Sequence, residues 1–535
     1  MTASTGKALA GVYVAMLAAL SALMGAVYSI YNSDAHHWGF ILGTALDFIR
    51  GRSLFSEVFI QYGAGQPMLY SVLSHVMPIN FSTIGFVVSV AYALTFAVLF
   101  LGLLELTSTV RAAAITTIAF LVHPFPSYPW PDYLAGLCLC VACYCMIKRG
   151  GGSAIAAAAS GLFLFLAFLF RNTYFVNVVA AMAAYVGLAS ISSRARSREI
   201  AVAIGVFALL TSGYFAFLYL QGNLGPWYRQ NFALATATYG VGAVSVNTVL
   251  VSVLIPQDLK AWIFTSLIAS NLAVLCMMTF GKDDRSIGGR ALPPGVVIFV
   301  ALLGMAGIVQ GLQLYETFRL QNAGISMYLG FACLVSLCVP SDAPARRQFG
   351  ANLTLVALVA FLLANFPARL DGENWSIVWP IVEAPPEGPE HRFSTANLLD
   401  RHSTLEIPIF RGHRFQADVK NYYEELTKYV CDGRRRIVNL TSDSTIPYLC
   451  TGQENALNMP FYNSGLLATI SPRNAEAINK GQFAADEVVV CDTNRGVFAS
   501  PSSAGLELIG TAKRPASIRF LNPREVSVYR VLRGQ

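Results

Sequence analysis

A short polar segment directly after the first long apolar run holds the side chains best suited to proton transfer. It reads Asn32-Ser-Asp34-Ala-His36-His37-Trp38-Gly39. An acid and two histidines beside a bilayer are costly to desolvate, so a specific role is expected for them. A carboxylate there can act as a general base, because it can accept a proton from an attacking group. The plainer alternative is that Asp34 caps the helix that follows, since a side-chain oxygen at a helix start accepts backbone N–H groups.

The two histidines are adjacent in sequence, which limits the kind of site that they can form. In a helix of 3.6 residues per turn, neighbouring side chains point about 100° apart. His36 and His37 therefore cannot easily ligate one metal ion, and we expect them to form hydrogen bonds or to contact a headgroup. We expect no cofactor, with a divalent metal as the less favoured alternative. The cysteines predict no zinc site, because no C-x-x-C pair is matched by a second one.

A second polar cluster lies between the third and fourth apolar runs. It reads His123-Pro-Phe-Pro-Ser-Tyr-Pro-Trp-Pro-Asp132-Tyr133. Prolines fix the backbone φ angle and remove N–H donors, so this segment is predicted to be an ordered loop rather than a helix. Asp132 then either caps the next helix or supplies a second acid on the same face.

Two arginines stand where topology disfavours cations. Arg171 lies between the fifth and sixth apolar runs, and Arg319 lies in a later loop on the same side. Guanidinium groups form paired hydrogen bonds to phosphate oxygens, so arginines at headgroup depth suit a lipid phosphate. The alternative is a general lipid-headgroup anchor or, for Arg319, an ion pair with Glu316.

Long apolar segments must position these residues. Of the 535 residues, 55% are hydrophobic and only 13% are charged, against about 25% charged in soluble domains. A helix needs about 20 apolar residues to cross a bilayer. Runs of that kind predict eleven spans, at residues 8–31, 81–105, 108–124, 132–148, 153–170, 173–191, 199–220, 259–280, 292–312, 325–340 and 349–367. The predicted fold class is a polytopic α-helical membrane protein.

The basic residues between the spans predict the orientation of the chain. They alternate, and the cation-rich side should be cytoplasmic. Its basic clusters are Lys7, Arg111, Lys148-Arg149, Arg194/Arg196/Arg198, Lys282/Arg285/Arg290 and Arg346-Arg347. With the N-terminus inside, an odd number of spans places everything after Pro367 outside, as in a protein of the bacterial inner membrane. The net charge of +7 reflects these clusters, and nucleic acid is not an expected partner.

The first outer loop, residues 32–80, is too long for a simple connector. The segment 39–51 places Thr44, Asp47 and Arg50 at helical spacing with apolar residues on the other faces, so we expect a helix lying in the membrane interface. A second helix is expected at 68–76. These helices should form one outer face on which a lipid headgroup meets a water-soluble partner.

From about residue 369 the composition becomes that of a soluble domain. We expect a periplasmic α/β domain at 369–535, after a membrane domain at 1–368. An amphipathic helix is predicted at 418–429, and buried strands at 436–440 and 487–491. Three cysteines would face an oxidising compartment, and we expect one disulfide, Cys431–Cys450, with Cys491 left over.

Taken together, these features resemble the GT-C superfamily of integral-membrane glycosyltransferases. The resemblance is carried by the acid after span one, the long first loop with two helices, the second outer acid and the soluble C-terminal domain. The stretches Asp34-Ala-His-His-Trp-Gly, Gly51-Arg-Ser-Leu-Phe and Gln61-Tyr-Gly-Ala-Gly-Gln-Pro look like the first-loop pattern of bacterial members. This chain lacks the adjacent acid pair that some members have.

The resemblance implies transfer of a sugar from a polyprenyl-phosphate-linked donor to a glycan, lipid or protein acceptor at the outer membrane face, among membrane lipids. It makes Asp34 the catalytic acid. Substrate contacts are then expected from His36, His37, Tyr62, Asp132, Arg171 and Arg319. The alternatives are a transporter, flippase or polymerase of lipid-linked glycans, or a scaffold without enzymatic activity.

Overall fold

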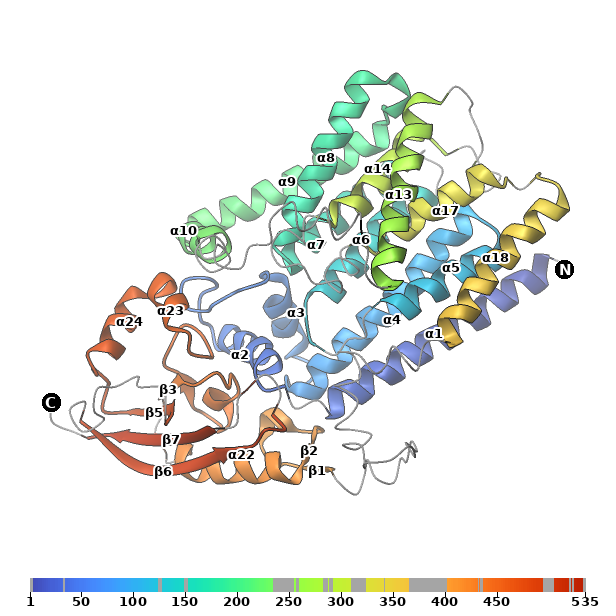
Figure 1. Cartoon of the computed structure of the whole chain (residues 1–535). Helices are drawn as coiled ribbons and strands as arrows, with labels where there is room; N and C mark the ends of the chain where they lie inside the picture. Colours follow the sequence, from blue (N-terminus) through green and yellow to red (C-terminus); the bar gives the residue numbers. More distant parts are fainter. Residues whose placement is uncertain are drawn as a thin grey trace.

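The structure is a computed structural model in which a helical bundle carries a smaller α/β domain against one end (Figure 1). The first outer loop lies between the two (Figure 1). The described residues are 3–31, 34–123, 128–148, 153–233, 255, 259–281, 287, 292–308, 324–340, 342–364, 402–431, 433, 436–493, 505–518, 521 and 524–532. The predicted boundary at 368/369 lies outside these residues.

Helices stand at all eleven positions where spans were predicted. They are α1 (Ala3–Tyr31), α4 (Phe81–Leu106), α5 (Thr109–Val122), α6 (Asp132–Lys148), α7 (Ala154–Phe170), α8 (Thr173–Ile191), α9 (Arg198–Leu220), α13 (Leu259–Phe280), α14 (Pro294–Ala306), α17 (Met327–Cys338) and α18 (Ala345–Ala364). Among the described residues, five helices are long and apolar enough to cross a membrane, and shorter apolar helices accompany them. The chain is a multi-pass membrane protein, as predicted.

The first outer loop contains both predicted helices, α2 (His37–Ile49) and α3 (Gly65–Leu73). Helix α3 begins before Pro67 rather than after it, because proline is tolerated in the first turn of a helix. The polar stripe of α2 is only partly open: Thr44 and Asp47 are 5% and 1% exposed, whereas Arg50 is exposed. Thr44 donates to the Phe59 carbonyl of the same loop, and Asp47 accepts from Tyr448 of the C-terminal domain.

The C-terminal domain is built on a five-stranded sheet of order β4-β3-β5-β7-β6. Its strands are β3 (Arg436–Leu440), β4 (Glu454–Asn455), β5 (Glu487–Asp492), β6 (Leu506–Arg514) and β7 (Arg524–Val531). β3 pairs in parallel with β4 and β5, whereas β7 is antiparallel to both of its neighbours. The strands at 436–440 and 487–491 are confirmed, and so is the α/β class of the domain.

Shorter elements complete this domain. They are β1 (His402–Thr404), the 3-10 turn η4 (Pro408–Phe410), β2 (Arg414–Gln416), α22 (Ala417–Val430), the 3-10 turn η5 (Ile446–Tyr448), α23 (Ser464–Ile470) and α24 (Pro472–Asn479). Helix α22 confirms the predicted amphipathic helix, because its apolar side chains are buried and its polar ones face outward. The Cys431–Cys450 disulfide is present, with the two Cα atoms 5.7 Å apart. Cys491 is the buried free thiol that was expected to remain.

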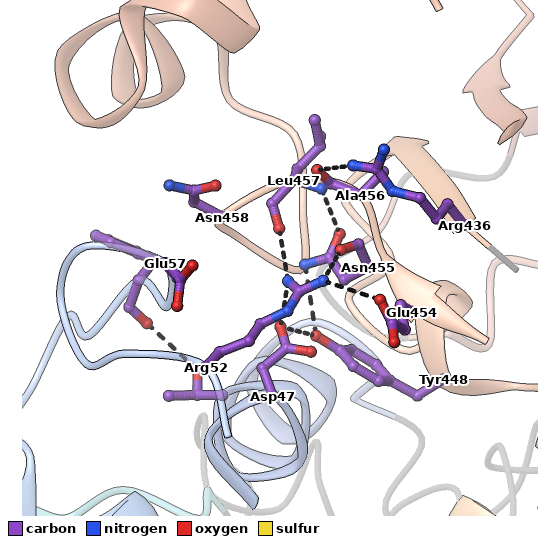
Figure 2. Close-up of polar contacts among 12 residues, drawn as sticks. Asp47, Arg52, Glu57, Arg436, Tyr448, Glu454, Asn455, Ala456, Leu457 and Asn458 are labelled. Carbon is purple, nitrogen blue, oxygen red and sulfur yellow. Dashed lines mark hydrogen bonds and ion pairs between the residues drawn. The ribbon is translucent and has the colours of Figure 1, made fainter. Parts of the chain in front are cut away.

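A polar junction joins the C-terminal domain to the first outer loop (Figure 2). The hydroxyl of Tyr448 donates to Asp47 Oδ2 at 2.9 Å, and Arg52 Nη1 lies 3.6 Å from the same oxygen. Arg52 Nη2 donates to the carbonyl of Asn455. Backbone contacts continue the junction, since Phe59 N donates to the carbonyl of Asn458 at 2.7 Å. These bonds hold the two parts of the chain in one arrangement.

Two glycines allow the C-terminal domain to approach α2 closely. A Cβ atom on Gly39 would lie 2.8 Å from Thr445 N, and one on Gly43 would lie 2.8 Å from the Tyr448 hydroxyl oxygen. Separations under about 3 Å are too short for carbon in van der Waals contact. The loop after β3 and the turn η5 can therefore rest on α2 only because these positions are glycine. This contact brings the carboxyl end of β3 to the start of α2.

Candidate active site

Asp34 is the most deeply buried polar residue at the start of α2, with no exposed surface. Its Oδ1 accepts the backbone N–H groups of His36 and His37 at 3.1 and 3.0 Å. Its Oδ2 lies 2.7 Å from His37 Nδ1. The acid therefore binds the free N–H groups that open the helix and also pairs with an imidazole. The capping role that the sequence offered as the plainer alternative is therefore present, together with an ion pair that the sequence did not predict.

Opposing effects set the charge of Asp34. Burial disfavours the carboxylate and by itself would raise the pKa. The charge of His37 and the hydrogen bonds from its side chain and backbone outweigh burial, so the pKa of Asp34 is lowered from its ordinary value. Asp34 is therefore ionised at neutral pH.

His36 is held by the C-terminal domain. Its Nδ1 lies 3.1 Å from the carbonyl oxygen of Ser442, in the loop after β3, and its ring packs edge-on against Phe461. Because a carbonyl only accepts, Nδ1 carries the proton. Burial and the charge of His37 lower the pKa of His36. The ring is therefore neutral, and its position depends on a residue 406 positions away.

His37, unlike Asp34, has a side chain that is partly exposed to solvent. Its side chain is 23% exposed, against 0% for that of Asp34. Its ring lies edge-on to Tyr128 and Trp130, with centroids 5.0 and 5.9 Å away. Those two rings stack on each other at 4.8 Å, which forms an aromatic wall beside the imidazole. In the described part of the chain, no group of three or more His, Cys, Asp or Glu side chains could hold a metal ion.

The second acid forms a buried ion pair. Asp132 is the first residue of α6, and its Oδ2 accepts from Arg171 Nη1 at 2.6 Å. The two side chains are only 2% and 3% exposed. Arg171 Nε also donates to the hydroxyl of Thr173 at 3.2 Å. Asp132 compensates the buried charge of Arg171, which is why an arginine is tolerated between α7 and α8.

Tyr62 links this ion pair to the first outer loop. The Arg171 guanidinium lies over the Tyr62 ring, 5.1 Å from its centroid. The Tyr62 carbonyl accepts from Asn172 N at 2.6 Å. The Tyr62 ring also lies edge-on to Phe40 of α2, at 5.9 Å. Gly63, next in sequence, has no space for a side chain because the end of α7 lies against it. The structure thus brings the Asp34–His37 pair and the Asp132–Arg171 pair to the same side of the bundle.

Several features of this region had no signal in the sequence. Phe55 adopts a φ of +66°, which is unusual for a bulky side chain. Gln230, in the π-helical turn Arg229–Ala233 (η2), holds this segment by donating to the Phe55 carbonyl and accepting from Ile60 N. The contacts of Ser442 and Phe461 were missed as well, because each joins residues hundreds of positions apart. Arg319 lies outside the described residues.

Comparison with known proteins identifies the fold. No family model and no curated protein matches the chain. The crystal structure of ArnT from Cupriavidus metallidurans in the apo state is similar with a TM-score of 0.53, at 10% identity over 98% of each chain. The chain has the GT-C fold. This confirms the fold expected from the two outer acids, the long first loop and the C-terminal domain.

A more distant similarity is to the archaeal oligosaccharyltransferase AglB from Archaeoglobus fulgidus. It covers 90% of this chain and 69% of that one, at 11% identity and a TM-score of 0.42.

Proposed function

We propose that this chain is a glycosyltransferase that moves a sugar from a polyprenyl-phosphate-linked donor to a glycan, lipid or protein acceptor. The reaction would take place at the outer face of the bacterial inner membrane, with the C-terminal domain in the periplasm. The observation that carries this proposal is the buried, ionised Asp34 paired with a partly exposed histidine. Attack on an anomeric carbon requires such a base to take the acceptor's proton.

The leaving lipid phosphate requires positive charge nearby, and Arg171 supplies it in this proposal. Two of its nitrogens are used by Asp132 and Thr173. Its Nη2 has no hydrogen-bond partner within the described part of the chain and could donate to a phosphate oxygen. Tyr62 would orient the guanidinium by packing beneath it. Arg319 remains a proposed second contact, and His36 a contact of the sugar or headgroup.

A transporter or flippase is the second candidate, and the distribution of charge argues against it. Ion-coupled transporters place ionisable residues at mid-bilayer and use broken helices there. In the described membrane helices, Asp, Glu, Lys and Arg occur only in the first or last two turns. The buried pairs Asp34–His37 and Asp132–Arg171 instead lie at helix ends, on the face that we propose to be the outer one.

The direct test is turnover of a panel of polyprenyl-phosphate sugars by purified protein in nanodiscs, with envelope glycans, lipids and proteins as acceptors. We expect one donor to be consumed and its polyprenyl phosphate to be released. Asp34→Asn should bind that donor and lose at least about a hundredfold in turnover. His75→Gln is the matched control, because His75 is an exposed histidine of the same loop. Transbilayer movement of an intact donor, without chemical change, would favour the flippase instead.

Metal dependence is part of the same proposal. We expect turnover to be unchanged after removal of divalent ions with EDTA, because charge stabilisation is assigned to Arg171 and the base to protein side chains. A loss restored by Mg²⁺ or Mn²⁺, but not by added salt of the same ionic strength, would assign the phosphate to a metal ion.

A further inference from the structure

We infer that His37, and not Asp34, takes the acceptor's proton, and that Asp34 acts through His37 as a positioning residue. This inference rests on the proposed function, since it names the base for that same reaction. A substrate can reach His37 but not Asp34, which is the first reason for this inference. Asp34 has no exposed surface, whereas the side chain of His37 is 23% exposed. A general base must lie within hydrogen-bond reach of the proton that it removes.

The hydrogen bonds of Asp34 also favour a positioning role over a role as the base. A carboxylate offers about four acceptor positions on its two oxygens. Three are filled, by the N–H groups of His36 and His37 and by His37 Nδ1. These bonds make the carboxylate a weak base, because each of them stabilises its charged form and together with the charge of His37 they outweigh burial. The carboxylate is well placed to orient an imidazole.

The pairing decides which atom of His37 is basic. An ionised carboxylate can only accept, so Nδ1 of His37 must donate its proton to Asp34 Oδ2, 2.7 Å away. The unprotonated atom of the neutral ring is then Nε2. Asp34 also stabilises the imidazolium that forms when Nε2 takes a proton, which is the role of a buried acid behind a catalytic histidine.

The groups around His37 are compatible with this role. Asp34 and His36 face it from its own segment, and Tyr128 and Trp130 face it from the loop before α6. Of these groups only His36 could form a cation, and burial and the charge of His37 lower its pKa and keep it neutral. Asp34 is therefore the charged group that pairs with His37, through its Oδ2 at 2.7 Å.

The step balances without a further reactant. The acceptor's oxygen or nitrogen attacks the anomeric carbon as its proton passes to His37 Nε2. The bond between that carbon and the phosphate oxygen breaks, and its electron pair leaves with the polyprenyl phosphate. The imidazolium then returns its proton to water or to the departing phosphate.

The pH profile of the unaltered protein is the first test, and it needs no variant. With an imidazole as base, kcat/KM should fall about tenfold per pH unit on the acid side of one titration between pH 8 and pH 5. A profile that stays flat from pH 8 down to pH 5 would assign the base to the carboxylate, whose pKa is lowered.

A double-mutant cycle is the second test. His37→Gln and Asp34→Asn should each lose at least about a hundredfold in turnover, and the double variant should lose little more than His37→Gln alone. Imidazole added to His37→Ala should restore part of the lost rate, which a merely structural histidine would not permit. If His37→Gln keeps more than half of the turnover, this inference fails while sugar transfer stands. If the unaltered protein consumes no donor, the proposed function itself fails.

Discussion

Asp34 and Asp132 are both buried acids near the first outer loop, and their partners indicate different roles for them. Asp34 pairs with a histidine that reaches the surface, so its charge can influence a reacting group. Asp132 pairs with Arg171, which is equally buried, so the main role of Asp132 is to compensate the positive charge of that arginine. Removing one partner of such a buried pair leaves an uncompensated charge, and that is costly.

The first prediction concerns the Asp132–Arg171 pair. Arg171→Ala should destabilise the protein by about 3–5 kcal/mol, because Asp132 is left buried and unpaired. Replacing both residues, as Arg171→Met with Asp132→Leu, should recover most of that stability. Thermal unfolding of the detergent-purified variants measures both effects. The double variant should still bind polyprenyl phosphate at least about tenfold more weakly, and unchanged affinity would place the phosphate contact elsewhere.

At the scale of elements, α2 is the helix that contacts both the membrane domain and the C-terminal domain. Asp34 lies just before its first residue. Gly39 and Gly43 leave room for Thr445 and Tyr448 of the C-terminal domain to pack against it. Asp47, near its end, accepts a hydrogen bond from Tyr448 in the polar junction. Small shifts of this helix would therefore move the candidate base relative to both domains. Two predictions test how tightly it is held.

The second prediction is steric. Gly43→Ala should cost about 1–3 kcal/mol, because the added methyl group meets the Tyr448 ring and the helix or the domain must shift. Gly187→Ala in α8 is the matched control, since a Cβ atom there meets nothing within 4 Å. Limited proteolysis and thermal unfolding compare the two variants. Equal behaviour would mean that the junction is looser than its contacts indicate.

The third prediction is a pH dependence set by Asp47. Burial raises its pKa to about 6, only partly offset by Arg52 and the Tyr448 hydrogen bond. The ordinary value is about 3.9, so the folded protein binds this proton more tightly than the unfolded chain. That contribution is complete below about pH 4 and is lost as the pH rises through 6.

Between pH 5 and pH 7 the loss from this group should be about 1 kcal/mol of unfolding free energy. Asp47→Asn should remove this part of the pH dependence, whereas Glu476→Gln, an exposed acid of α24, should leave it unchanged. Thermal unfolding at several pH values is the measurement. A rise in stability of the unaltered protein over this range, cancelled by Asp47→Asn, would contradict the assignment.

On the scale of the whole molecule, the arrangement depends on the compartment in which the C-terminal domain folds. This domain covers the first outer loop, so both must lie on the same side of the membrane. The Cys431–Cys450 disulfide links two positions of this domain that are 19 apart in sequence. Disulfides persist in oxidising compartments, which agrees with the proposed periplasmic placement.

The fourth prediction combines topology and redox state. Cys431 and Cys450 should resist alkylation until the purified protein is reduced, and Cys431→Ser should destabilise the domain by about 2–5 kcal/mol. A reporter fused after Gln535 should be active in the periplasm only. Activity of the reporter in the cytoplasm, with both thiols free, would reverse the topology and every outer-face assignment.

By itself, the sequence determined the class and the order of the elements. Apolar runs long enough to span a bilayer predict helices wherever they occur, and all eleven were found. Local patterns also predicted α22, β3 and β5, and the cysteine pair was correctly expected. These features depend on periodicity, on turn chemistry or on compartment, all of which are local or compositional.

Only the tertiary structure decided which polar residues meet. The sequence placed Asp34, His37, Asp132 and Arg171 on one face, but nothing local could pair Arg171 with Asp132 or His36 with Ser442. The polar stripe of α2 was assigned to the membrane interface because an exposed face and a face covered by another domain show the same pattern. Contacts between residues far apart in the chain depend on how whole elements pack, and that packing is encoded jointly by many residues.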